Sequence, residues 1–161
     1  MAMGATIGII LGNLLGANKM EEAKRTNLKL CTFSTVLCIG VAIIFAGIAE
    51  FIPYLYNTTD SVRSLATGLM LISAFIMPFN GLVLCLYYTL RSGGKALMTF
   101  VFDSGFMWGV SVPLAFLLSY FTSIPILPLY FICQSVYLLK MTVGIILVKR
   151  GNWLKNIVDN K

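Results

Sequence analysis

Long apolar runs, separated by short polar segments, dominate the chain. Five are visible, at about residues 1–17, 28–54, 62–90, 96–120 and 126–148. Each of the last four exceeds about 20 residues, the length of helix that crosses roughly 30 Å of hydrocarbon. No alternation with a period of two is sustained, so the pattern predicts helices rather than strands. The first run is marginal in length and has no polar flank, so we expect it to continue a helix of a longer protein.

The predicted fold class is therefore all-α, a polytopic bundle of about five transmembrane helices. Composition agrees, because 58% of the residues are hydrophobic and only 11% are charged, whereas a soluble domain needs about a quarter. The expected partner is the lipid bilayer. The net charge of +6 does not indicate nucleic acid, because the cations lie between apolar runs.

The residue types argue against catalysis. Histidine, the commonest general base and metal ligand, does not occur in the sequence. The four cysteines all lie in apolar runs and form no C-x-x-C pair, which is typical of apolar packing residues. We expect no enzymatic activity, no metal site and no cofactor apart from a coupling ion.

The distribution of cations predicts the topology. The second and fourth connections between the apolar runs together hold one cation, Arg63. The other connections and the tail together hold ten, namely Lys19, Lys24, Arg25, Lys29, Arg91, Lys95, Lys149, Arg150, Lys155 and Lys161. Cytoplasmic loops are enriched in Lys and Arg. The sequence therefore predicts a multi-pass protein of the cell membrane with a cytoplasmic first loop and a cytoplasmic tail at 149–161.

Four glycines recur every fourth residue in the first run, at Gly4, Gly8, Gly12 and Gly16. On a helix they form one smooth ridge, where another backbone can approach closely. This pattern predicts a packing face and leaves open whether the helix also slides against its neighbours.

Several segments resemble motifs of the multidrug and toxic compound extrusion (MATE) family. Residues 12–25, GNLLGANKMEEAKR, resemble the family's G-x-x-L-G-A-x-x-x-x-x-A-K segment, and residues 90–94, LRSGG, resemble its L-R-G-x-G turn. A D-x-x-x-x-W-x-x-x-x-P pattern and a basic helix end also match, at Asp103, Trp108 and Pro113 and at Gly151, Asn152 and Trp153. Together these motifs cover nearly the whole chain.

The resemblance implies a twelve-helix transporter of two lobes, of which residues 1–161 match part of the C-terminal lobe, helices eight to twelve. It implies an antiporter, coupled to Na⁺ or H⁺, that exports drugs or amphipathic organic cations by alternating access. The missing N-terminal lobe and small organic cations are then the expected partners. Two alternatives remain: a related flippase for lipid-linked oligosaccharides or polysaccharide precursors, and a truncated remnant that does not transport.

Four side chains are candidates for substrate binding or ion coupling. Asp103 and Lys140 lie inside predicted helices, where charges are costly and usually functional. The helices are consecutive and antiparallel, and the two residues lie about 20 and about 17 positions from the loop centre, so we predict that they pair. In some relatives carboxylates on helices seven and ten bind sodium; the helix-ten equivalent here has none, and offers only Asn80 and Tyr87.

Overall fold

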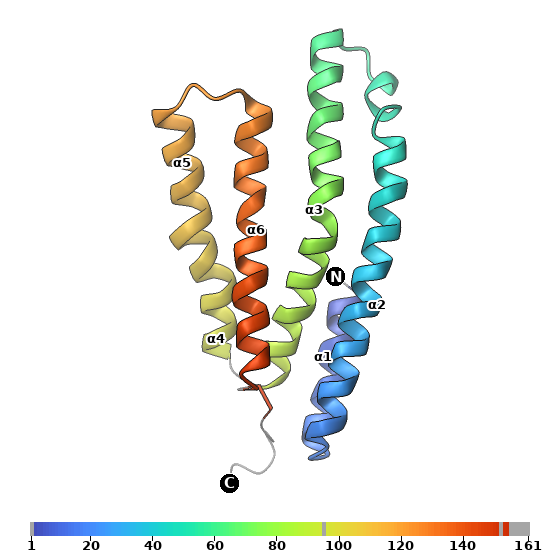
Figure 1. Cartoon of the computed structure of the whole chain (residues 1–161), viewed down its shortest axis with the longest axis vertical. Helices are drawn as coiled ribbons and strands as arrows, with labels where there is room; N and C mark the ends of the chain where they lie inside the picture. Colours follow the sequence, from blue (N-terminus) through green and yellow to red (C-terminus); the bar gives the residue numbers. More distant parts are fainter. Residues whose placement is uncertain (1, 95, 152, 155–161) are drawn as a thin grey trace.

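The computed structural model describes residues 2–94, 96–151 and 153–154. Within them the fold is all-α, as predicted, and no strand occurs in this part of the chain. Two antiparallel hairpins stand side by side, and a short helix lies along the lower half of one of them (Figure 1). The main helices are α1 (Ala2–Gly16), α2 (Met20–Ile48), α3 (Asp60–Ser92), α5 (Val112–Phe121) and α6 (Ile126–Lys149). The central helix is α3, which packs against α1, α2 and α6.

The helix α2 corrects the predicted second span, which was placed at 28–54. It begins at Met20 and ends at Ile48, and a 3-10 turn, η1 (Ile52–Leu55), follows. The first connection is therefore only three residues long, and Asn18 makes the turn in the left-handed conformation at φ 59°, which asparagine tolerates. The polar residues assigned to a loop instead form the first turns of α2, because Glu, Lys, Arg and Ala are good helix formers.

Salt bridges support this polar start of α2. Lys19 Nζ lies 3.1 Å from a Glu22 carboxylate oxygen, and Lys24 Nζ lies 2.7 Å from one of Glu21. Both pairs are spaced three residues apart, and both acids lie in the first turn, where the helix dipole favours negative charge. Each contributes little singly, because all four side chains are more than half exposed.

The fourth predicted span is helical but irregular. It consists of α4 (Ala96–Phe100), the π-helical segments η2 (Val101–Gly105) and η3 (Met107–Ser111), and α5. Pro113 has no N–H to donate to the carbonyl one turn before it, which disrupts the regular helical bonding upstream. The N–H of Phe106 donates to the carbonyls of Asp103 and Val101, and the second of these lies five residues back. Such wide turns are frequent at functional sites.

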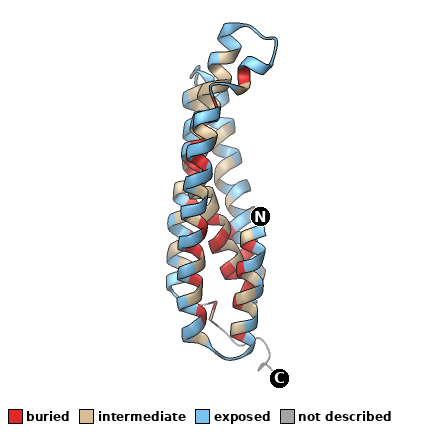
Figure 2. Ribbon diagram, turned by 90° about the vertical axis from the view of Figure 1, so that its right-hand side faces the viewer, coloured by how far each residue is buried: buried red, intermediate tan, exposed pale blue. Residues whose placement is uncertain are grey.

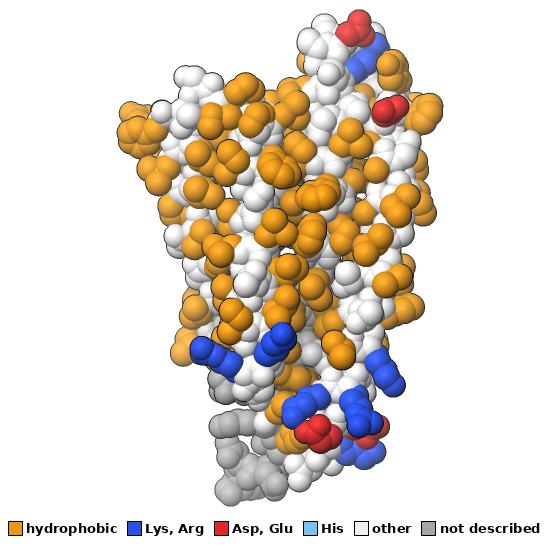
Figure 3. Space-filling view, in the orientation of Figure 1, with side chains coloured by type: hydrophobic (Ala, Val, Ile, Leu, Met, Phe, Trp, Pro, Cys, Tyr) orange, Lys and Arg blue, Asp and Glu red, His pale blue; other side chains and the backbone are white. Residues whose placement is uncertain are grey.

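Four helical stretches are long and apolar enough to cross a membrane: 20–48, 60–92, 97–121 and 126–149. The helix α1 is apolar but shorter. Apolar side chains cover the middle of the visible surface, whereas Lys and Arg gather at its lower end (Figure 3). This pattern makes the chain a multi-pass membrane protein, in which the apolar band faces lipid. Which side of the membrane holds the cation-rich end stays a prediction, and residues 155–161 of the predicted tail lie outside the described residues.

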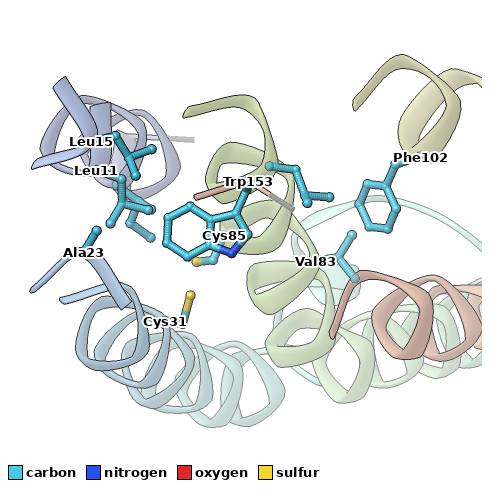
Figure 4. Close-up of a cluster of buried hydrophobic side chains, with 10 residues drawn as sticks. Leu11, Leu15, Ala23, Cys31, Val83, Cys85, Phe102 and Trp153 are labelled. Atoms are coloured by element: carbon cyan, nitrogen blue, oxygen red, sulfur yellow. The ribbon is translucent and has the colours of Figure 1, made fainter. Parts of the chain in front are cut away.

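The best-packed core lies toward the cation-rich end. Buried residues concentrate in the lower half of the bundle (Figure 2). The Trp153 indole, 2% exposed, lies between α1, α2 and α3, with Leu15 and Cys85 among its neighbours in the cluster (Figure 4). Its Nε1 donates to the Val148 carbonyl at 3.0 Å. The backbone of Trp153 lies so close to Gly93 that a Cβ there would collide with it. The segment after α6 thus folds back and ties four helices together.

Candidate functional site

A polar cavity of about 440 Å³ lies where α3, η2 and α6 meet. It contains all four candidates predicted from the sequence: Asn80, Tyr87, Asp103 and Lys140. Its other walls come from α3 and α6, and they are formed by Val83, Leu84, Tyr88, Arg91 and Tyr137. The structure therefore brings together residues that lie up to 60 positions apart in the sequence.

The predicted pairing of Asp103 with Lys140 is confirmed. Lys140 Nζ donates to Asp103 Oδ1 at 2.6 Å, a short charge-assisted hydrogen bond. The two partners differ in burial, because the lysine side chain is 11% exposed and the aspartate side chain 55%. Lys140 is thus an internal charge held by one carboxylate, whereas the carboxylate also faces the polar cavity.

A second contact holds the ammonium of Lys140. Its Nζ lies 5.3 Å from the ring centroid of Phe102, within the range of a cation–π interaction. Phe102 is 4% exposed and directly precedes the aspartate. The π-helical segment η2 therefore presents two successive side chains to the same lysine. This arrangement stabilises the largely buried ammonium through one carboxylate and one aromatic ring.

The α3 side of the cavity follows from helical spacing. Asn80, Tyr87 and Arg91 are separated by seven and four residues, so they lie on one face of the helix. Arg91 was counted among the loop cations and within the LRSGG segment, and it was not among the residues predicted for the site. In the structure Arg91 lines the cavity and forms no ion pair with any described residue. The spacing from Tyr87 was the pattern that could have revealed it.

Tyrosines supply the aromatic part of the cavity. Tyr87 and Tyr88 pack edge to face, with ring centroids 5.3 Å apart, and Tyr137 lies one turn before Lys140 on α6. The sequence reasoning missed both Tyr88 and Tyr137. The second could have been found from its position three residues from an internal lysine, because such residues share a helix face.

The glycine ridge of α1 is in contact over only part of its predicted length. A Cβ at Gly4 would collide with the Tyr88 ring, and one at Gly8 would lie 3.4 Å from it. A Cβ at Gly12 would meet nothing within 4 Å, and Gly16 is exposed. Within the described residues the ridge therefore packs through its first half, and packing of Gly12 and Gly16 stays a prediction. There α1 buries Leu11 and Leu15, which share a helix face with Gly4, because a spacing of four residues drifts around a helix of 3.6 residues per turn.

The donor atoms of the cavity are mostly oxygens. Among the described residues, no three His, Cys, Asp or Glu side chains gather as a metal-binding group. The cavity does provide one carboxylate, one amide and three phenol groups beside two cations. Such a set can bind a small hard cation at the carboxylate, or an anionic group at the guanidinium.

Comparison with known proteins gives a consistent result. The model of the MatE family matches residues 1–117, which is most of the chain. A relative from Bacillus subtilis (strain 168), named as a probable multidrug resistance protein YoeA, is 27% identical over 128 residues. The match covers 79% of this chain but only 27% of that relative, so the chain spans about a quarter of its length. No solved structure gave a significant match.

Proposed function

The chain belongs to the MatE family, and on this premise we propose that it forms part of an efflux transporter that exports drugs or amphipathic organic cations. The relative from Bacillus subtilis, whose name describes a probable multidrug resistance protein, supports this proposal. Since the chain spans only a quarter of that relative, the activity belongs to a complete transporter in which a second lobe completes the central cavity. Transport then proceeds by alternating access, with the two lobes rocking about that cavity.

The observation that carries the proposal is the Asp103–Lys140 pair beside the polar cavity. Internal charges are rare in membrane helices and mark ion or substrate pathways. A proton or a sodium ion that reaches Asp103 from the cavity would compete with the Lys140 ammonium. The lysine would then lose the Asp103 carboxylate while remaining largely buried, which is unfavourable. Cation binding at Asp103 thereby favours a rearrangement of η2 relative to α6.

The cavity can also accommodate an incoming sodium ion. Hard cations prefer oxygen ligands, and the Asn80 amide and the Tyr87 phenol line the same space as the carboxylate. An organic cation could bind there in the alternate state, with its aromatic part against the tyrosines. Sodium or a proton and the exported cation would then compete for one carboxylate, which is the requirement for antiport.

Efflux of a fluorescent cation from pump-deficient cells tests this function. The chain is expressed within its complete reading frame, and sodium and pH gradients are imposed separately. We expect D103N and K140M each to abolish coupled efflux, and the charge swap D103K/K140D to restore part of it. The matched control is D60N, in an exposed ion pair at the opposite end of the bundle. Normal efflux by D103N would contradict the proposal.

The genomic sequence upstream of residue 1 provides a separate test. An in-frame continuation that encodes further membrane helices supports a complete transporter. A stop codon directly upstream would instead favour a truncated remnant, and efflux should then be absent from cells that express the chain.

A second candidate function rests on the position of Arg91. Two cations, Arg91 and Lys140, line the cavity against one carboxylate, which suits a substrate that carries a phosphate. Export of a lipid-linked oligosaccharide would fit this charge balance. Loss of cell-surface polysaccharide in R91Q cells, with cation efflux unchanged, would favour this candidate over drug export.

A further inference from the structure

A second cavity, of about 530 Å³, lies at the cation-rich end of the bundle, away from the polar cavity. It is a groove between α2 and α6, with α3 as its floor, because α2 and α6 both pack along α3 and hardly contact each other. Most of its walls are hydrocarbon, contributed by Leu28, Val36, Leu82, Leu86, Ile145 and Val148. Two of these residues, Leu28 and Val36, are 70% and 62% exposed, so the groove reaches the apolar surface that faces the bilayer.

Lysines line this groove at the point where its helices leave the apolar band. Lys24 lies in the second turn of α2, and Lys149 is the last residue of α6. Lys149 forms no ion pair with any residue that the structure describes. Lys24 pairs with Glu21, but both side chains are at least half exposed, so this pair is weak and easily exchanged. The groove thus combines an apolar interior with two available positive charges.

We propose that this groove binds an anionic phospholipid. Its phosphate lies between Lys24 and Lys149, and one acyl chain lies along the apolar walls between α2 and α6. Basic pockets between transmembrane helices are suited to such headgroups, and the two lysines provide the complementary charge. A soluble anion would gain nothing from the hydrocarbon walls, whereas a zwitterionic lipid would gain little from two cations. The chemistry therefore favours an anionic lipid of the leaflet at the cation-rich end.

The two tryptophans of the chain provide matched reporters. Trp153 lines the groove, whereas Trp108 lies on η3, is 74% exposed and does not line it. The variant W108F leaves Trp153 as the single fluorophore, and W153F leaves Trp108. Each chain is reconstituted in bilayers that contain brominated phosphatidylglycerol or brominated phosphatidylcholine at increasing mole fractions. Bromine near the headgroup end of the acyl chain quenches an indole at short range, and Trp153, although only 2% exposed, lines the groove.

We expect the anionic lipid to quench Trp153 at a mole fraction about five- to twenty-fivefold lower than the zwitterionic lipid does. Each lysine near a membrane surface contributes about 1 kcal/mol to the binding of an anionic lipid, which is about a fivefold change in affinity. Trp108 should respond equally to both lipids, because bulk lipid contacts it. The double variant K24Q/K149Q should make the Trp153 response equal for both lipids, and high salt should weaken the preference.

Two results would overturn the proposal. Equal quenching of Trp153 by both lipids in W108F would show that the groove does not distinguish headgroups. Quenching of Trp108 but not of Trp153 would show that protein, such as a second copy or further helices, covers the groove. If W153F does not fold, the Trp108 response is obtained as the difference between the unaltered chain and W108F. Neither result depends on the lysine variants.

Discussion

Removal of the two members of the internal ion pair should have unequal effects. In D103A the Lys140 ammonium, whose side chain is 11% exposed, loses the carboxylate that it contacts in the structure. In K140M the Asp103 carboxylate loses its lysine, but it is 55% exposed toward a polar cavity in which water can replace the lost bond. The aspartate variant should therefore be the less stable of the two.

The magnitudes follow from these environments. Loss of one partner of a fully buried pair costs about 3–5 kcal/mol. The Phe102 ring, 5.3 Å from Lys140 Nζ, still offers about 0.5–1 kcal/mol of cation–π stabilisation, and the cavity admits some water. We therefore expect D103A to lower the free energy of unfolding by about 2–3 kcal/mol. K140M retains most of the apolar stem, and it should cost about 1 kcal/mol or less.

Titration of the purified chain with SDS in mixed micelles, followed by far-UV circular dichroism, measures these differences. The matched control is D60A, which removes the same side chain from an exposed pair in which Asp60 is 97% exposed. It should cost less than about 1 kcal/mol. The double variant D103A/K140M should be more stable than D103A, because the unpaired ammonium is gone. The reasoning is refuted if K140M is as destabilising as D103A, or if D103A is no worse than D60A.

Three further predictions concern packing and topology. G4L should prevent folding, since a side chain there meets an aromatic ring, whereas G12L should fold normally because its site is open; equal protease resistance of both variants would contradict this. An impermeant thiol reagent should label T59C in intact cells, and A17C only after permeabilisation; the reverse result would invert the topology. T89V should cost about 1–3 kcal/mol in the same SDS titration, because it removes a 2.7 Å hydrogen bond to a buried amide; an unchanged midpoint would show that the bond contributes nothing.

Much of the fold could be predicted from the sequence because a bilayer imposes simple rules. A helix must satisfy its own backbone and must be about 20 apolar residues long to cross the membrane. These rules predicted the helices at 62–90 and 126–148 to within two residues of α3 and α6. They failed at the start of α2, because hydropathy detects where lipid contact begins and not where the helix begins. Residues 20–27 are polar and helical at once.

The sequence predicted which residues of the candidate site lie at a similar depth in the membrane, because depth follows from the number of residues to the nearest loop. Asp103 and Lys140 lie at similar distances from one short loop, so their approach followed from length and helical rise. The sequence did not predict how each helix is rotated about its own axis, because this rotation depends on how the side chains of neighbouring helices pack together. That rotation brings Arg91 into the cavity and leaves Gly12 facing open space.

The sequence by itself determined a membrane-embedded, all-helical chain with ten of its twelve cations on one side of the bundle, and with Asp103 and Lys140 at similar depth. These properties follow from composition and spacing, which act locally along the chain. Only the tertiary structure decided that the aspartate, the lysine, an arginine and three tyrosines share one cavity, and that Trp153 folds back into the core. Those features arise from contacts between residues far apart in the sequence, and packing of whole helix faces selects them.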